Sequence, residues 1–244
     1  MTFQTTRWSL ILRARQPDAV GREALEELLA AYWQPVYAFY RRLGADAETA
    51  ADLTQGLFAH LLARDDLAAA APERGRFRAF LATCARHWWM NERARATSAK
   101  RGGGVTPLPL DRGETETWLA TEPVHGLDAD AVFERRWAQT VIERALWQLE
   151  QEELAAGRRE QFAVLRAVLD GSPPPEPWAV LAARLDTTEG ALKVAAHRLK
   201  ERFRVRILAE VRQTLADECA PGEELQELLA ALQRTAAGFS GDSR

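Results

Sequence analysis

The sequence predicts an all-α protein made of two helical domains that are joined by a flexible acidic linker. Three observations indicate this architecture. Along most of the chain, apolar residues recur at spacings of three and four, which places them on one face of a helix. No stretch alternates apolar and polar residues over the length of a strand. From Val105 to about Gly126 the composition shifts to Thr, Pro, Gly and acidic residues, which is typical of a segment between domains.

The first domain is expected over residues 1–104. A helical region over 24–43 contains Pro35, where we expect a kink, and Gly44 ends it. Asp46 caps a second helix that runs to about residue 64, and Gly56 lies in its interior on the outward face, where another group can pack closely or where the position is simply indifferent.

A third helix of this domain is expected over residues 76–96, after a loop over 65–75. It carries an apolar side and a polar, basic side. Trp88 and Trp89 are adjacent and stand beside arginines, which suits stacking on unpaired bases. Equally, one tryptophan belongs to the core and the other lies half-buried beside it.

The linker is expected over residues 105–127 and the second domain over 128–216. Helices are predicted at 128–153, 159–169 and 178–185, followed by a basic helix that Thr187 or Thr188 caps and that continues to about residue 215. A short polar turn separates the last two helices, and the second of them is basic. This pattern is typical of a helix-turn-helix, whose second helix enters the major groove of DNA, and equally of a helical hairpin with a solvated basic face.

Residues 217–244 form a C-terminal extension with an amphipathic helix over 223–232, which Pro221 and Gly222 separate from the preceding helix. Two hypotheses remain open for it. The extension folds back over the second domain and regulates it, or it is an inert cap.

Charge is segregated along the chain, although the formal net charge of the 244 residues is only −3. Eight basic residues stand against two acidic ones over 73–101, and six against one over 193–206, whereas 111–134 holds seven acidic residues and one arginine. Because a polyanion responds to local fields, the two basic stretches are candidate nucleic-acid surfaces.

Several functional classes are not indicated by the sequence. It contains no G-x-S-x-G element, no phosphate-binding glycine loop and no His/Glu pair at metal-ligand spacing, so we expect no catalysis, no cofactor and no metal. Cys84 and Cys219 fit reduced thiols. Since no apolar run is long enough to cross a bilayer and no signal peptide is evident, we expect a soluble cytoplasmic protein.

Three motifs resemble the two-domain sigma factors of bacterial RNA polymerase of the extracytoplasmic-function (ECF) type. The first, D-L-T-Q-G-L-F over residues 52–58, is similar to the family's D-L-x-Q-E-x-F element. The second, over 77–95, is similar to its F-x-x-W-L-x-x-I-A-R-N element, and the third, over 177–193, is similar to its helix-turn-helix. The resemblance covers roughly residues 5 to 215, and the three motifs stand in the family's order.

The resemblance implies a promoter-specificity subunit, with a sigma region 2-like bundle in the first domain and a sigma region 4-like helix-turn-helix in the second. The implied partners are core RNA polymerase, the duplex −35 element and the melted −10 element, and the resemblance leaves room for an anti-sigma factor or another regulator. The residues implied for polymerase binding are Asp52, Leu53, Gln55, Gly56 and Phe58. Those implied for the −10 element are Arg74, Arg76, Phe77, Arg78, Arg86, Trp88, Trp89, Asn91, Arg93 and Arg95. Those implied for the −35 element are Thr188, Glu189, Gly190, Lys193, Val194, His197, Arg198 and Arg202.

The chain departs from the family pattern at several positions. Gly56 replaces a Glu, His87 stands where Asn is usual, and Asp186 replaces the Gly of the turn. Val194 and Ala195 stand where the family often has Ser and Arg, so base recognition is expected to rest chiefly on Lys193, His197 and Arg198. Two other functions remain as alternatives: an autonomous helix-turn-helix regulator that never contacts the polymerase, and a helical adaptor with merely solvated basic faces.

Overall fold

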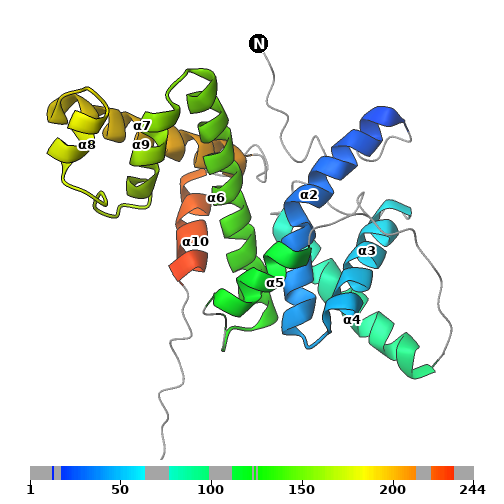
Figure 1. The fold of residues 1–244 in the computed structure, drawn as a ribbon. Coiled ribbons are helices and arrows are strands. Elements are labelled where there is room, and N and C mark those ends of the chain that lie inside the picture. Colours follow the sequence, from blue (N-terminus) through cyan, green and yellow to red (C-terminus); the bar gives the residue numbers. More distant parts are fainter. Residues whose placement is uncertain are drawn as a thin grey trace, which may run out of the picture. The chain divides into compact units, whose positions relative to one another are not determined.

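The computed structural model describes residues 18–63, 77–98, 112–122, 126–212 and 221–233, together with residues 13 and 124. Helices and turns account for this part of the chain, and none of its residues lies in a strand, which confirms the all-α prediction (Figure 1). Two compact units can be distinguished. Unit 1 takes its residues from 1–140 and 212–244, and unit 2 consists of residues 141–211.

Unit 1 is built around α2 (Ala19–Arg42), α3 (Ala47–Ala63) and α4 (Phe77–Ser98). Asp18 caps α2 by accepting a hydrogen bond from the Gly21 amide at 2.8 Å. Pro35, where we expect a kink, lies inside α2, which continues through it as one helix. Asp46 accepts from the Thr49 amide at 2.8 Å, which confirms the predicted cap of α3.

Aromatic side chains from α2 join these three helices. Tyr32 meets Phe77 of α4 edge to face, with ring centroids 5.2 Å apart. The Tyr40 hydroxyl donates to the Ala85 carbonyl of α4 at 3.2 Å, and burial raises the pKa of Tyr40 above its usual value. Leu57 and Leu61 bring α3 into the same core.

The segment that we predicted to be a flexible linker contains a helix. Residues 112–121 form α5 (Arg112–Thr121), in which Thr115 and Trp118 are buried. The Glu116 carboxylate accepts two hydrogen bonds from the Arg41 guanidinium, at 2.6 and 2.9 Å, and a third from the Tyr37 hydroxyl at 2.6 Å. The acidic composition that suggested a tether thus serves to hold α5 on α2; residues 105–111 lie outside the described part of the chain.

The clamp between Glu116 and Arg41 predicts acid sensitivity. The Arg41 hydrogen bonds hold the pKa of Glu116 below its usual value. A carboxyl whose pKa is lowered in the folded state contributes stability that is present above its unfolded pKa and is lost as the pH falls through its folded pKa. The urea concentration at the midpoint of unfolding should therefore decrease as the pH is lowered below about 4.5, a value near the unfolded pKa of Glu. This decrease should be steeper in the parent chain than in Glu116→Gln. Equal slopes in the two proteins would contradict this role.

Helix α6 (Ala129–Ala155) passes from unit 1 into unit 2, so the boundary between the units lies within a helix and not in the linker. Its first half packs in unit 1, where Val132, Phe133 and Trp137 are buried, and its second half places Leu149 in the core of unit 2. One helix can serve two cores because each half buries its own stripe of apolar residues.

Helix α10 (Pro221–Gln233) belongs to unit 1. It begins at Pro221, which we had expected to precede the helix; proline suits the first helical position, where its missing amide has no partner to lose. Leu228 and Ala231 are buried, and the Leu232 carbonyl accepts from Arg135 of α6 at 2.5 Å. Helix α10 therefore packs within unit 1, against the half of α6 that belongs to that unit, and its regulatory role stays a hypothesis.

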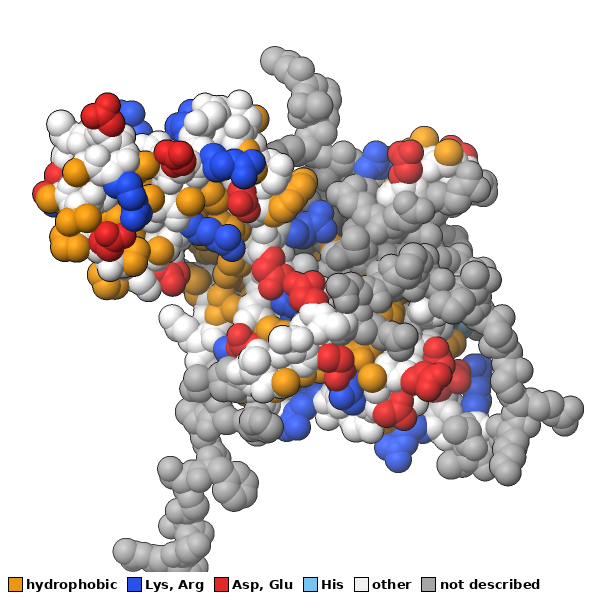
Figure 2. Space-filling view, viewed as in Figure 1, with side chains coloured by type: hydrophobic (Ala, Val, Ile, Leu, Met, Phe, Trp, Pro, Cys, Tyr) orange, Lys and Arg blue, Asp and Glu red, His pale blue; other side chains and the backbone are white. Residues whose placement is uncertain are grey.

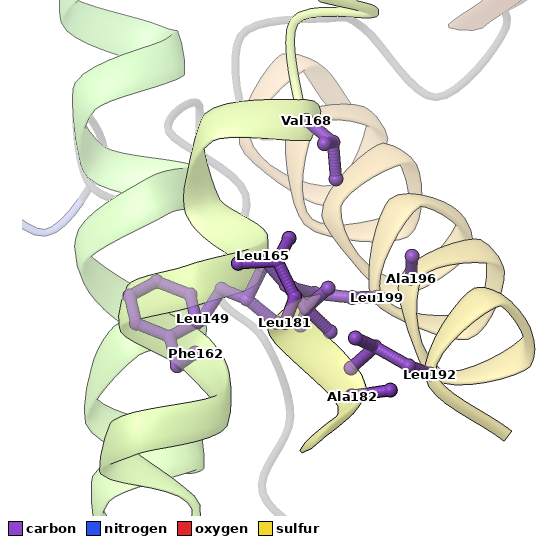
Figure 3. Close-up of a cluster of buried hydrophobic side chains, with 9 residues drawn as sticks. All are labelled: Leu149, Phe162, Leu165, Val168, Leu181, Ala182, Leu192, Ala196 and Leu199. Carbon is purple, nitrogen blue, oxygen red and sulfur yellow. The ribbon is translucent and has the colours of Figure 1, made fainter. Parts of the chain in front are cut away.

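Unit 2 combines the end of α6 with α7 (Arg159–Leu165), the short 3₁₀ helix η3 (Arg166–Val168), α8 (Trp178–Arg184) and α9 (Glu189–Arg212). Figure 3 shows the side chains that these elements direct toward one another. The buried cluster consists of Leu149, Phe162, Leu165, Val168, Leu181, Ala182, Leu192, Ala196 and Leu199. Among the helices described in the two units, none is long and apolar enough to cross a membrane.

Candidate nucleic-acid interface

In unit 2, α8 and α9 are joined by a short turn that a left-handed residue makes possible. Asp186 has a φ of 48°, a conformation that aspartate tolerates better than most residues. The Thr187 amide donates to the Ala182 carbonyl at 3.0 Å, and the Thr188 hydroxyl accepts from the Ala191 amide at 3.2 Å. The turn thus closes α8 and starts α9, as the sequence predicts for Thr188.

Burial divides α9 into an inner and an outer face. Leu192, Ala196 and Leu199 point into the core. The residues proposed for the −35 element that are exposed on the outer face are Thr188, Glu189, Gly190, Lys193, Val194, His197 and Arg198. On the side of unit 2 visible in Figure 2, basic, acidic and hydrophobic side chains alternate.

The cations of α9 differ in their partners. The Lys193 ammonium lies 2.5 Å from the Glu189 carboxylate, one turn earlier. None of the described residues forms an ion pair with Arg198 or Arg204. Arg198 and Arg204 therefore carry exposed charges that are available to a phosphate or a base.

Arg202 is engaged inside unit 2, although we had expected it on DNA. Its guanidinium donates to Glu152 at 2.8 Å and also to Glu153, both on α6. Glu153 is only 3% exposed and also accepts two hydrogen bonds from Arg158, which lower the pKa of this carboxyl. Because Glu153 is buried and Arg202 is one of its two cationic partners, Arg202 ties α9 to α6 and we remove it from the interface.

On α4 the predicted −10 residues fall into two groups. Phe77 is 1% exposed and belongs to the core of unit 1, and Arg78 is 4% exposed. The predicted −10 residues of α4 that are exposed or partly exposed are Arg86, Trp88, Trp89, Asn91, Arg93 and Arg95. Arg74 and Arg76 lie outside the described residues. We therefore withdraw Phe77 and Arg78 from the DNA surface and keep the second group.

Arg78 joins three helices of unit 1. Its Nε donates to Glu134 of α6 at 2.7 Å, and a terminal nitrogen donates to Glu227 of α10 at 2.8 Å. The guanidinium carbon lies 4.5 Å from the centre of the Trp137 ring. A side chain held in this way supports the fold and is not displayed to a ligand.

The two adjacent tryptophans lie in different surroundings, and both are partly buried. Trp89 stacks on Tyr40 with ring centroids 6.1 Å apart, and the Arg93 guanidinium lies 5.4 Å from its centre. Trp88 packs on His60 of α3, with centroids 4.9 Å apart. Neither is the fully buried core residue that we had considered.

A pocket of about 220 Å³ lies between α3 and α4. Its lining consists of Leu57, His60, Leu61, Phe80, Cys84, His87, Trp88 and Asn91. Apolar walls with a few imidazole and amide groups suit a flat heterocycle. The sequence did not lead us to assign His60, Cys84 and His87 to a site. Their spacing nevertheless indicates it, because each lies three or four positions from another residue that lines the pocket, on the facing stripes of the two helices.

On α3, the proposed polymerase-binding residues are only partly on the surface. Asp52 is exposed, Leu53 and Gln55 are half-buried, and Phe58 is 5% exposed. Phe58 packs in the core of unit 1, so it supports this face from below and does not form part of it.

Gly56 faces Trp88. A Cβ atom added at residue 56 would lie 3.0 Å from the Trp88 ring, closer than ordinary van der Waals contact. The indole therefore has to shift by a few tenths of an ångström before residue 56 can carry a side chain. Of the two explanations considered for a mid-helix glycine, close packing is the one observed.

We expect Gly56→Glu to destabilise unit 1 by about 1–3 kcal/mol, because the new side chain must displace Trp88. Urea unfolding followed by tryptophan fluorescence measures this. Gly190→Ala is the matched control, since nothing lies within 4 Å of its added Cβ and alanine favours a helix. The combination of Gly56→Glu with Trp88→Ala should recover part of the loss, and a purely additive double variant would contradict the proposed fit.

Residues 28–99 match the family model described as Sigma-70 region 2. This match supports a sigma-70 family factor with a role in promoter recognition and RNA polymerase binding. It covers α3, α4 and the pocket between them, and it ends before α5. No curated protein and no solved structure matches the chain.

Proposed function

We propose that the chain is a sigma factor of the ECF type, a promoter-specificity subunit without catalysis of its own. In this role it binds core RNA polymerase, recognises the −35 and −10 elements and helps to open the DNA in the cytoplasm. The observation that carries the proposal is the region 2 match over the two helices that combine the exposed carboxylate of Asp52 with the basic, aromatic side of α4.

In unit 1, Asp52 and Gln55 of α3 offer a polar surface to the polymerase. The pocket between α3 and α4 accepts one base that is extruded from the −10 region. Stacking on Trp88 and hydrogen bonds to His87 or Asn91 offset the cost of unstacking, which is a few kcal/mol. Arg93 and Arg95 then follow the displaced strand on the exposed side of α4.

In unit 2, α8 and α9 act as a helix-turn-helix whose second helix enters the major groove at the −35 element. The exposed outer face of α9 supports this role. Lys193, His197 and Arg198 are positioned for base edges and nearby phosphates, whereas the buried row of Leu192, Ala196 and Leu199 fixes the helix on unit 2.

The test is transcription in vitro with bacterial core RNA polymerase, the full chain and genomic promoter DNA, with mapped start sites. We expect stable association with core polymerase and initiation at a defined set of promoters. Duplex binding without any association with core polymerase would establish the autonomous regulator instead. If the chain bound neither DNA nor polymerase, the helical adaptor would be the remaining alternative.

Lys193→Glu should lower transcription from a −35-dependent promoter at least tenfold, because a negative charge then faces DNA phosphates. Binding to core polymerase should be unchanged. The variant also places two carboxylates at positions 189 and 193 of one helix turn, a cost of only about 0.2–0.5 kcal/mol that does not unfold α9.

Arg166→Glu is the matched control for this variant. Arg166 is an exposed arginine of η3 in the same unit but outside α8 and α9, so its replacement changes the charge with little effect on promoter choice. If both variants reduced transcription equally, the net charge of unit 2 and not the outer face of α9 would govern promoter binding.

A further inference from the structure

The outer face of α9 carries an apolar spot near its beginning. Val194 is 49% exposed, and Ala191, three positions earlier on the same face, is exposed as well. Gly190 adds no side chain beside them, and open space surrounds its backbone. The helix therefore presents a small hydrophobic surface at the end where a recognition helix meets base edges.

Val194 is not among the side chains that pack on the buried cluster of unit 2. A β-branched residue is less favourable in a helix than alanine, and a half-exposed isopropyl group gains little from burial. Leu192 and Ala196 already supply the core contacts of this turn. The exposed isopropyl group of Val194 is therefore available to a surface that the free chain does not contain.

The charges around the spot indicate what that surface is. The Lys193 charge beside it is already balanced by Glu189, so the centre of the face is locally neutral. One turn later, His197 and Arg198 are exposed, and Arg204 continues the row. A neutral apolar centre followed by available cations fits a groove whose floor has an apolar group and whose rims carry phosphates.

In the major groove, the apolar group that distinguishes the base pairs is the 5-methyl group of thymine. We infer that Val194, supported by Ala191, contacts a thymine methyl group in the −35 element and is a specificity-determining residue of this chain. This inference rests on the proposed function. It adds a requirement for thymine at one position to the polar contacts of Lys193, His197 and Arg198.

The test uses the holoenzyme formed from the full chain and core polymerase, and the duplex that this holoenzyme selects from a pool randomised over the −35 region. Each thymine of the selected element is then replaced by uracil, which removes only the methyl group. We expect one or two positions at which uracil weakens binding about fourfold, the effect of one buried methyl group.

The matched variants are Val194→Ala and Val205→Ala. Val205 lies on the same helix and is 61% exposed, but it is three turns beyond Val194. With Val194→Ala the effect of uracil should disappear, whereas with Val205→Ala it should stay fourfold. Uracil sensitivity that persists unchanged in Val194→Ala, or is absent in the parent chain, overturns the inference. Failure of the holoenzyme to select any duplex would instead overturn the proposed function.

Discussion

Arg78→Ala is expected to destabilise unit 1 by about 2–3 kcal/mol, less than the cost of breaking a fully buried charge pair because Glu134 and Glu227 are partly exposed. The guanidinium lies between Glu134 and Glu227 and on the face of Trp137, so alanine leaves two neighbouring carboxylates without their cation and a gap beside the indole. Urea unfolding at pH 7 gives the free energy.

Arg86→Ala is the control for this change, because Arg86 lies on the same helix and pairs with Asp130 at the surface. An exposed pair of this kind contributes less than about 1 kcal/mol. A chain that ends at residue 220 lacks Glu227, Leu228 and Ala231, so it should lose most of the unfolding free energy that Arg78→Ala loses. Combining the truncation with Arg78→Ala should cost less than the sum of the two separate losses. If Arg78→Ala cost no more than Arg86→Ala and instead weakened binding to −10 DNA, our original assignment of Arg78 to the DNA surface would be restored.

Leu199→Ala is expected to destabilise unit 2 by about 2–5 kcal/mol. Leu199 is buried in the cluster that joins α9 to α6, α7 and α8, and truncating it leaves a cavity in the middle of that cluster (Figure 3). Val205→Ala, at an exposed position of the same helix, should change stability by less than about 0.5 kcal/mol.

Hydrogen exchange of backbone amides distinguishes where Leu199→Ala acts. We expect faster exchange in α7, α8 and the first half of α9, with the amides of α2 and α3 unchanged, because the contacts of Leu199 lie within unit 2. Uniformly faster exchange along the whole chain would mean that the two units unfold together.

Helix positions were predictable because the signals for them are local. The cap at Asp46, the left-handed Asp186 and the spacing of Leu192, Ala196 and Leu199 each involve residues within a few positions of one another. The exception among the helices is α5. Its Thr, Gly and acidic residues are typical of a linker, and only Arg41 and Tyr37, more than 70 residues earlier, provide the partners that Glu116 needs.

The candidate site was predictable in its outline and not in its details. Helical periodicity predicts which residues of α4 and α9 are exposed. It also places the basic residues of each helix on one side. Periodicity does not show which arginine is paired. Arg78 meets partners 56 and 149 residues away in the chain, and Arg202 meets carboxylates 49 and 50 residues away.

The sequence by itself determined that this chain is helical, where most helices begin and end, and which two stretches carry excess positive charge. Only the tertiary structure decided which of those charges are used inside the protein, which side chain packs against Gly56 and to which unit the C-terminal helix belongs. The physical reason is that capping and periodicity act over one or two helical turns, whereas burial and ion pairing depend on residues that only folding brings together.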